Sequence, residues 1–213
     1  MPTIKLWNHA IETKKGFALK KGKVYSLLRK ERKEVHKFIQ EQLRKRYIKL
    51  SKSSQMVPVF FVEKKNGKKK MVQDYYYLNK WTIKNNYPLP LILDIIKNIN
   101  TKKVFIKLDL HWGYNNVQIK EDDEWKVVFV TLEELFEPTV MFFRLTNFLA
   151  MFQMIINEIL WDLINTEKVV SFIDEIIVET KKKKGYDEIV EEVVKILAEN
   201  DLYMKLEKCK WKV

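Results

Sequence analysis

The stretch Val169-Val-Ser-Phe-Ile-Asp-Glu-Ile-Ile-Val178 decides how this chain folds, because two acids, Asp174 and Glu175, interrupt a strongly apolar run. Two adjacent carboxylates inside one buried strand would cost roughly several kcal/mol. A tight β-turn with the acids at its tip removes that cost, so the run predicts two short strands, at 169–173 and 176–180. Considered alone, a solvated turn without any function is the simpler interpretation of these two acids.

A third acid, Asp109, changes that balance. It lies near the end of Val104–Leu110, an apolar stretch that predicts a buried strand. A lone carboxylate there is costly unless it is paired or bound to a metal ion. Three carboxylates at strand ends suit a site of hard oxygen ligands, in which Mg²⁺ bridges phosphate groups. Two such ions can hold the attacking and leaving oxygens of an in-line phosphoryl transfer.

Charge is distributed unevenly along the chain, whose formal net charge is +12. Residues 1–52 contain 16 Lys/Arg and 4 Asp/Glu, whereas residues 91–213 contain 17 and 22. A basic part followed by a mildly acidic part suggests that one part holds an anionic polymer on which the other part acts. A solvated basic helix without a partner, a membrane-surface helix and a calmodulin-type target remain open, because charge alone does not separate them.

The composition excludes several other classes. A chain of 213 residues with 46% hydrophobic residues can form one compact unit or two small ones. The single cysteine, Cys209, excludes an internal disulfide and a multi-cysteine zinc site. No apolar run reaches the ~18 residues of a membrane span, and the amino terminus does not resemble a secretion signal. Phosphate-loop, dinucleotide, nucleophile-elbow and zinc-protease motifs are absent, and His9, His36 and His111 lack ligand spacing.

Apolar periodicity predicts helices and strands that alternate irregularly, which favours an α+β fold over a regular βαβ winding. Asn66-Gly67 marks the turn of a predicted hairpin. Helices are expected over residues 26–48, 88–99, 148–163 and 187–200. Strands are expected over residues 57–62, 69–73, 104–110, 127–131, 139–143, 169–173 and 176–180.

Several short blocks occur in an order that is typical of one family. They are VPVFFVEKKNG at 57–67, DYYYLNK at 74–80, YPLP at 87–90, KLDL at 107–110, GY at 113–114, LTN at 145–147, FQ at 152–153, FIDE at 172–175, and NDLY to KC at 200–209. With these blocks the chain resembles the reverse transcriptase of gypsy-like long-terminal-repeat retrotransposons. The FIDE block stands where that family has an aromatic residue, any residue and two aspartates.

The resemblance implies the fold of a right-hand polymerase, of α+β class, with fingers and palm. The palm is expected to have a ferredoxin-like antiparallel sheet with helices on one face. Residues 1–23 would be a leader segment, 24–90 and 119–147 the fingers, and 91–118 and 148–213 the palm. The thumb and RNase H are expected to be absent from this chain.

Roles for individual residues also follow from the resemblance. Asp109, Asp174 and Glu175 would be catalytic and would hold two Mg²⁺ or Mn²⁺ ions. Four residues would bind the nucleotide: Lys64 and Lys70 at the triphosphate, Tyr114 at the sugar 2′-hydroxyl, and Phe143 at the sugar and template. Core packing remains the alternative for Tyr114 and Phe143. Arg144 and Gln153 would contact template or primer.

The implied partners are an RNA or DNA template with its primer, and deoxynucleoside triphosphates. No membrane is expected to be involved, and the oligomeric state stays open. The resemblance implies an intracellular location, in a cytoplasmic particle or in the nucleus.

Some positions depart from the family pattern. Arg144 replaces a glycine, Leu149 a proline and Tyr76 an arginine, and the chain has only 5 glycines. Glu175 is one methylene longer than the aspartate of the family, and a displacement of about 1 Å can cost ~10²-fold in rate. The main hypothesis is therefore an active RNA-directed DNA polymerase. The alternative is a catalytically impaired retroelement remnant that at most binds nucleic acid, and a basic structural adaptor comes third.

Overall fold

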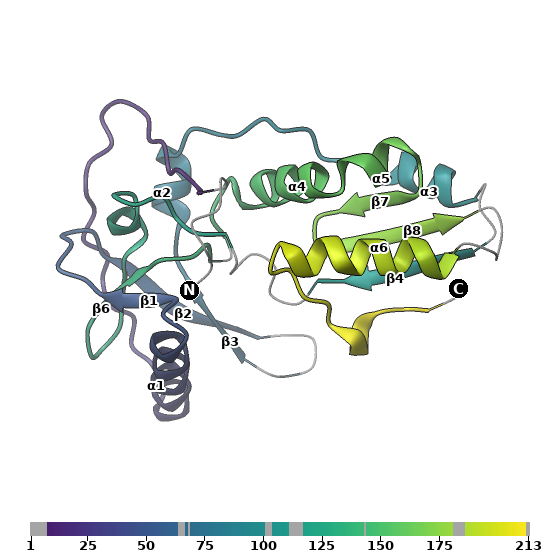
Figure 1. Cartoon of the computed structure of the whole chain (residues 1–213). Coiled ribbons are helices and arrows are strands. Elements are labelled where there is room, and N and C mark those ends of the chain that lie inside the picture. Colours follow the sequence, from purple (N-terminus) through teal and green to yellow (C-terminus); the bar gives the residue numbers. More distant parts are fainter. Residues whose placement is uncertain are drawn as a thin grey trace. The chain divides into compact units, whose positions relative to one another are not determined.

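Two compact units make up the chain in the computed structural model, which describes residues 8–63, 67, 69–100, 104–110, 117–142, 144–180 and 186–211. Unit 1 comprises Met1–Lys84 and Val117–Phe148, and unit 2 comprises Asn85–Asn116 and Leu149–Val213. Each unit has its own sheet (Figure 1). Helices and strands alternate irregularly in both units, which confirms the predicted α+β class.

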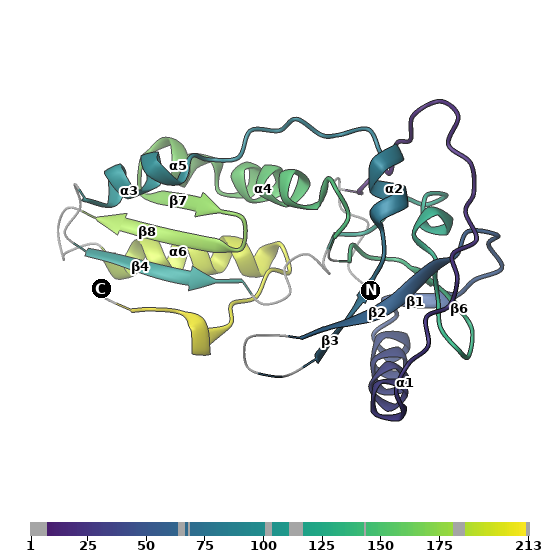
Figure 2. The same ribbon diagram turned by 180° about the vertical axis from the view of Figure 1, so that it is seen from behind.

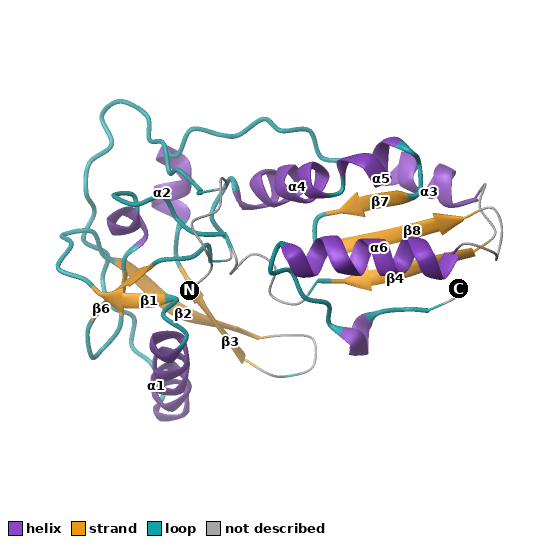
Figure 3. Cartoon of the chain, in the orientation of Figure 1, coloured by secondary structure: helices purple, strands orange, loops and turns teal. Residues whose placement is uncertain are grey.

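The predicted leader segment is part of unit 1. Residues 8–28 run mostly as loop (Figure 3), but they are tied to the rest of the unit. Ile11 is 1% exposed, and isolated bridges join residues 9, 13 and 21 to residues 119, 82 and 56. The limits of the two units also lie a few residues from the predicted limits of fingers and palm.

Unit 1 is built on a five-stranded mixed sheet with the order β1-β6-β5-β2-β3. Strands β2 and β3 form the predicted antiparallel hairpin, whereas β2 and β5 are parallel. The elements of unit 1 are α1 (Arg29–Arg44), β1 (Ile48–Leu50), β2 (Val57–Glu63), β3 (Lys69–Gln73), α2 (Tyr76–Trp81), η2 (Glu124–Val127), β5 (Phe129–Val130) and β6 (Leu135–Pro138).

Helix α1 begins at Arg29 and not at the predicted cap Ser26. The reason is Glu31, whose carboxylate accepts a hydrogen bond of 2.9 Å from the backbone N–H of Leu28. The same carboxylate lies 2.6 Å from the ammonium of Lys69 on β3. One glutamate thus fixes both the start of α1 and its contact with the hairpin.

The strand predicted over residues 139–143 is wrong, because the strand that pairs with β5 is β6, over Leu135–Pro138. The hydroxyl of Thr131 accepts hydrogen bonds from the N–H groups of Glu133 and Glu134, and the N–H of Thr131 donates to the carbonyl of Glu134. This tight turn reverses the chain earlier than the apolar pattern indicates.

Unit 2 contains a three-stranded antiparallel sheet with the order β4-β8-β7. Its elements are α3 (Ile92–Asn100), β4 (Val104–Asp109), α4 (Phe148–Ile159), α5 (Trp161–Asn165), β7 (Val169–Phe172), β8 (Glu175–Thr180), α6 (Tyr186–Glu199) and η3 (Leu206–Lys208). Bridges from Met204 to Leu110 and from Lys210 to Lys107 place the C-terminal segment along the free edge of β4. The resulting order, C-terminal segment-β4-β8-β7, is that of a ferredoxin-like sheet.

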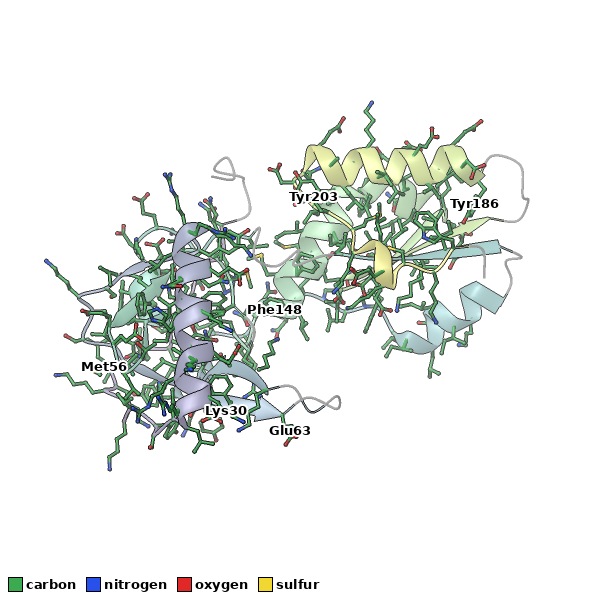
Figure 4. All side chains as sticks on the ribbon, turned by 90° about the horizontal axis from the view of Figure 1, so that it is seen from below. Lys30, Met56, Glu63, Phe148, Tyr186 and Tyr203 are labelled. Carbon is green, nitrogen blue, oxygen red and sulfur yellow. The ribbon has the colours of Figure 1, made fainter. Side chains whose placement is uncertain are left out.

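One face of this sheet packs against helices. Ile106, Leu108, Ile176 and Val178 alternate onto that face and are at most 1% exposed. Helix α6 crosses β8 and β4 on this side (Figures 1 and 2), and side chains of helix and strands meet between them, with Tyr186 at the start of the helix (Figure 4). Helix α4 reaches the same face through a hydrogen bond from Gln153 to Ser171. The predicted helices on one face of the palm-type sheet are confirmed.

The helices within the described residues are all too short or too polar to cross a membrane.

A buried histidine gives unit 1 a predicted dependence on pH. His9 is 2% exposed, its Nδ1 lacks a hydrogen-bond partner, and burial lowers its pKa from 6.5 to about 4 against the opposing effect of Asp123. Between those values the unfolded chain binds a proton that the folded chain does not. Stability is therefore fully present above pH 6.5 and decreases by up to about 3 kcal/mol as the pH falls to about 4.

Urea denaturation from pH 7.5 to pH 4 measures this effect, with His9→Gln as the control that removes the titrating group. The difference in unfolding free energy between the two proteins should depend on pH below 6.5. If the unfolding free energies of the two proteins changed with pH in parallel, the lowered pKa of His9 would be contradicted.

Candidate active site

Asp109 and Glu175 lie opposite each other at one end of the unit 2 sheet. Asp109 is the last residue of β4 and Glu175 the first of β8, and the two are direct partners in the antiparallel ladder. Directly opposed residues place their side chains on the same face of a sheet. That face is the one opposite the helices, since Leu108 and Ile176 point to the helix side.

Asp174 lies beside this pair, in the turn between β7 and β8. Its carbonyl accepts a hydrogen bond of 2.8 Å from the N–H of Leu110, which ties the turn to the end of β4. Burial raises the pKa of Asp174, and the charges of Asp109 and Glu175 raise it further, while Lys208 lowers it. The structure therefore brings the three predicted acids into one electrostatically coupled group.

Two lysines that the sequence analysis did not single out neutralise part of this charge. Lys208 Nζ lies 3.2 Å from Asp109 Oδ2, and the ammonium of Lys107 pairs with Glu175. Lys107 precedes Asp109 by two residues, so the period of a strand could have placed it on the same face. Lys208 lies about a hundred residues away in the chain, and no local pattern indicates the contact.

The C-terminal segment brings Lys208 to this position. The N–H of Lys205 donates to the carbonyl of Asp109 at 2.8 Å, and Lys107 and Lys210 exchange two backbone hydrogen bonds. Between these anchors the η3 turn projects Lys208 towards the acids, and Cys209 Sγ lies 3.5 Å from the N–H of Asp109. Asp109 is therefore fixed from its backbone as well as from its side chain.

The acids suit a divalent cation by donor type, since carboxylate oxygens are the ligands that Mg²⁺ and Mn²⁺ prefer. Among the residues that the structure describes, however, no group of three or more His, Cys, Asp or Glu side chains is close enough together to hold a metal ion. Two of the three carboxylates are paired with an ammonium instead, Asp109 with Lys208 and Glu175 with Lys107. A cation at this site would have to compete with those ammonium groups.

Gln153 has a different position from the one that the resemblance implies. Its side chain is completely buried and bonds to Ser171, Asn157 and the N–H of Ile173, all within unit 2. A side chain without exposed surface does not reach template or primer. The contact predicted for Gln153 therefore disagrees with the structure, because the space around its amide is filled by the protein itself.

Arg144, in unit 1, has a backbone conformation that favours glycine, with φ of 77°. Its guanidinium lies over the ring of Phe60, with 5.3 Å between the guanidinium carbon and the ring centroid. Its carbonyl accepts a hydrogen bond of 2.6 Å from Asn79, whose Oδ1 accepts one from the N–H of Thr146. The arginine thus occupies a turn that remains shaped for glycine.

The predicted nucleotide-binding residues are only partly described. Lys70 lies on β3 opposite Val62, half-buried, within unit 1. Lys64, Tyr114 and Phe143 lie outside the described residues. Their roles stay predictions.

Comparison with known proteins assigns the chain to a family. Residues 62–213, more than half of the chain, match the model for reverse transcriptase (RNA-dependent DNA polymerase). The chain is 34% identical over 173 residues to the Transposon Tf2-3 and Tf2-4 polyproteins of Schizosaccharomyces pombe. That alignment covers 81% of this chain and only 13% of each polyprotein.

Solved structures agree on the fold. The structure of the foamy viral protease-reverse transcriptase in complex with an RNA/DNA hybrid matches 96% of this chain and 27% of that chain, with a TM-score of 0.86 and 22% identity. The dRH form in complex with double-stranded DNA matches 92% of this chain and 34% of that chain, with a TM-score of 0.82 and 24% identity.

The fold, with its acids at the end of a ferredoxin-like sheet, is that of a right-hand polymerase with fingers and palm. The chain belongs to the reverse transcriptase (RNA-dependent DNA polymerase) family, and it is a reverse transcriptase domain of the kind found in retroelement polyproteins. The predicted resemblance is thereby confirmed.

The turn at Arg144 leads to a prediction about stability. Arg144→Gly should be more stable than Arg144→Ala by about 1 kcal/mol, because both lose the contact with Phe60 but only glycine adopts a positive φ without strain. At an ordinary loop position alanine would be the more stable of the two. Urea denaturation of both variants at pH 7 measures the difference, and equal stability or a more stable alanine variant would contradict the strain.

Proposed function

We propose that this chain catalyses the transfer of deoxynucleotides to a primer 3′-hydroxyl, directed by an RNA or DNA template. The observation that carries this proposal is the grouping of Asp109, Asp174 and Glu175 at one end of the unit 2 sheet, in a chain of the reverse transcriptase family. Unit 1 would serve as fingers and unit 2 as palm. Because the chain spans about 13% of the polyproteins it matches, the activity of a whole polyprotein is not assigned to it.

Asp109 and Asp174 would hold two Mg²⁺ or Mn²⁺ ions, with Glu175 as the third carboxylate. Such ions activate the primer hydroxyl and stabilise charge on the leaving pyrophosphate. The N–H groups of Leu110 and Lys205 fix the backbone beside the acids. The ion pairs of Lys208 with Asp109 and of Lys107 with Glu175 would have to break before the ions bind. Burial of Asp109, whose side chain is 8% exposed, keeps water away from one side of the group.

Nucleic acid would be the polymer that the basic part of the chain binds. The similar foamy viral structures are complexes with an RNA/DNA hybrid and with double-stranded DNA, which supports a duplex as the partner here. Lys64 and Lys70 would contact the triphosphate of the incoming deoxynucleotide, and Tyr114 and Phe143 its sugar. Charge-assisted contacts of lysines to phosphate weaken with added salt, so binding should decrease steeply as the salt concentration rises.

An impaired remnant is the second candidate, and two observations favour it. Arg144 is held at a positive φ with its guanidinium on Phe60, and Glu175 is paired with Lys107. The first feature adds bulk next to the expected nucleotide site, and the second withdraws a carboxylate from the ions. Both features lower the rate of transfer without preventing binding of primer and template.

Competition between Lys208 and a cation gives a prediction about metal binding. Lys208→Met should bind Mn²⁺ about three- to tenfold more tightly than the unmodified chain, because an ammonium that is half-exposed competes only weakly for Asp109. Lys195→Met is the matched control, since Lys195 makes an exposed pair with Glu199 on α6. Titration of free Mn²⁺ by electron paramagnetic resonance gives the affinities, and unchanged binding in Lys208→Met would contradict the competition.

A primer-extension experiment separates the two candidate functions. The unmodified chain should bind primer–template and incorporate single nucleotides slowly. Arg144→Gly combined with Glu175→Asp should incorporate them faster than either single variant, since each change removes one obstacle and misplacement by about 1 Å costs up to ~10²-fold. All four proteins are compared at the same Mg²⁺ and salt concentrations, with binding measured by fluorescence anisotropy.

The outcomes of this experiment are distinct. Rapid incorporation by the unmodified chain would exclude the impaired remnant. Absence of binding at low salt, with the fold intact by circular dichroism, would contradict both candidates. Binding without incorporation in all four variants would leave the chain as a nucleic-acid-binding remnant.

A further inference from the structure

The turn that presents Asp174 is strained. Strands β7 and β8 pair as far as Phe172 and Glu175, so the loop between them consists of Ile173 and Asp174 alone. Ile173 has φ of 58°, a left-handed conformation that β-branched residues rarely adopt. Such a conformation persists only where neighbouring groups hold it.

Gln153 on α4 is the group that holds this turn. Its Oε1 accepts a hydrogen bond of 2.7 Å from the N–H of Ile173. Its Nε2 donates to Ser171 Oγ and to Asn157 Oδ1, both at 2.8 Å. Because a backbone N–H only donates, the orientation of the amide is fixed, and both of its ends are engaged.

The hydrogen bonds continue beyond Gln153. Ser171 Oγ donates to Asn157 Oδ1 at 2.7 Å, and Asn157 Nδ2 lies 2.8 Å from the hydroxyl of Tyr87. The network therefore joins α4, β7, the turn and the segment that leads to α3, all within unit 2. Gln153 and Ser171 are buried within this network, so a rotation of the Gln153 amide would leave a buried group without a partner.

We propose that Gln153 is a positioning residue, which holds Ile173 in its left-handed conformation and so fixes the carboxylate of Asp174 beside Asp109. A side chain that served only to join α4 to β7 would have sufficient partners in Ser171 and Asn157. The additional bond to Ile173 N–H, outside the strand ladder, places the amide on the turn itself. The inference deepens the proposed function, and its catalytic consequence depends on that function.

The test compares Gln153→Met with Gln55→Met in the whole chain. Gln55 is the matched control, because it is equally buried and accepts a backbone N–H, that of Lys20 at 2.9 Å, but lies in unit 1. Hydrogen exchange of the segment that contains Ile173 should become faster in Gln153→Met only. Mn²⁺ affinity and kcat for single-nucleotide incorporation should each fall by about tenfold, with KM for the nucleotide unchanged.

A second change distinguishes positioning from a general structural role. Ile173→Gly adopts the left-handed conformation unaided. Added to Gln153→Met, it should restore part of the Mn²⁺ affinity, although the lost contacts to Ser171 and Asn157 remain absent. If Gln153→Met does not fold, Ser171→Ala, which removes one partner of the amide, should produce the same changes to a smaller degree.

The results separate this inference from the proposed function. Exchange and Mn²⁺ affinity that are equal in Gln153→Met, Gln55→Met and the unmodified chain would overturn the positioning role. An unmodified chain that incorporates no nucleotide would contradict the proposed function. Faster hydrogen exchange of the segment that contains Ile173 in Gln153→Met would still support the role of Gln153 in holding the turn.

Discussion

The pairing register of β4 with β8 is the constraint on which the candidate site depends. It sets Asp109 opposite Glu175, and the turn that precedes β8 then brings Asp174 to the same end of the sheet. A slip of β8 by one residue would turn Glu175 towards the helices and Ile176 outwards, so that the two acids would no longer share a face. Burial of the apolar face therefore also fixes which face carries the acids.

Grouping three carboxylates has an electrostatic cost, which the structure shows in the raised pKa of Asp174. Lys208, in η3, reduces that cost, and Lys107, on β4, pairs with Glu175. Since an ion pair that is half-exposed is weak, a divalent cation bound as proposed would replace an ammonium there. On the proposed function, the same lysines would pair with the carboxylates in the absence of metal and release them when metal is bound.

Much of the fold could be predicted from local patterns. The turn at Asp174, the hairpin of β2 and β3 and the α4 helix follow from apolar runs and their interruptions, and the family blocks supplied the architecture. Strand β6 could not be predicted in this way, because hydrogen bonds to Thr131 determine where the chain reverses.

Only the parts of the site that residue type and short spacing indicate could be predicted. Asp109, Asp174 and Glu175 stood out because carboxylates are costly in apolar strands. The contact of Lys208 with Asp109 arises from tertiary packing of the C-terminal segment, for which the sequence has no local signal. The burial of Gln153 was missed for a similar reason, since its partners Ser171 and Ile173 come from another strand and its turn.

Two turns of this chain contain a left-handed residue that is not glycine, and a hydrogen-bonded side-chain amide stabilises each of them. Arg144 and Ile173 are both left-handed residues that are not glycine, and both are held by a side-chain amide from another element, Asn79 in one case and Gln153 in the other. A chain with 5 glycines has to stabilise such turns by external hydrogen bonds instead of by intrinsic preference. Hydrogen bonds with the side-chain amides of Asn79 and Gln153 thus offset the strain of the backbone in these turns. The conformation of each turn therefore depends on a residue from another element.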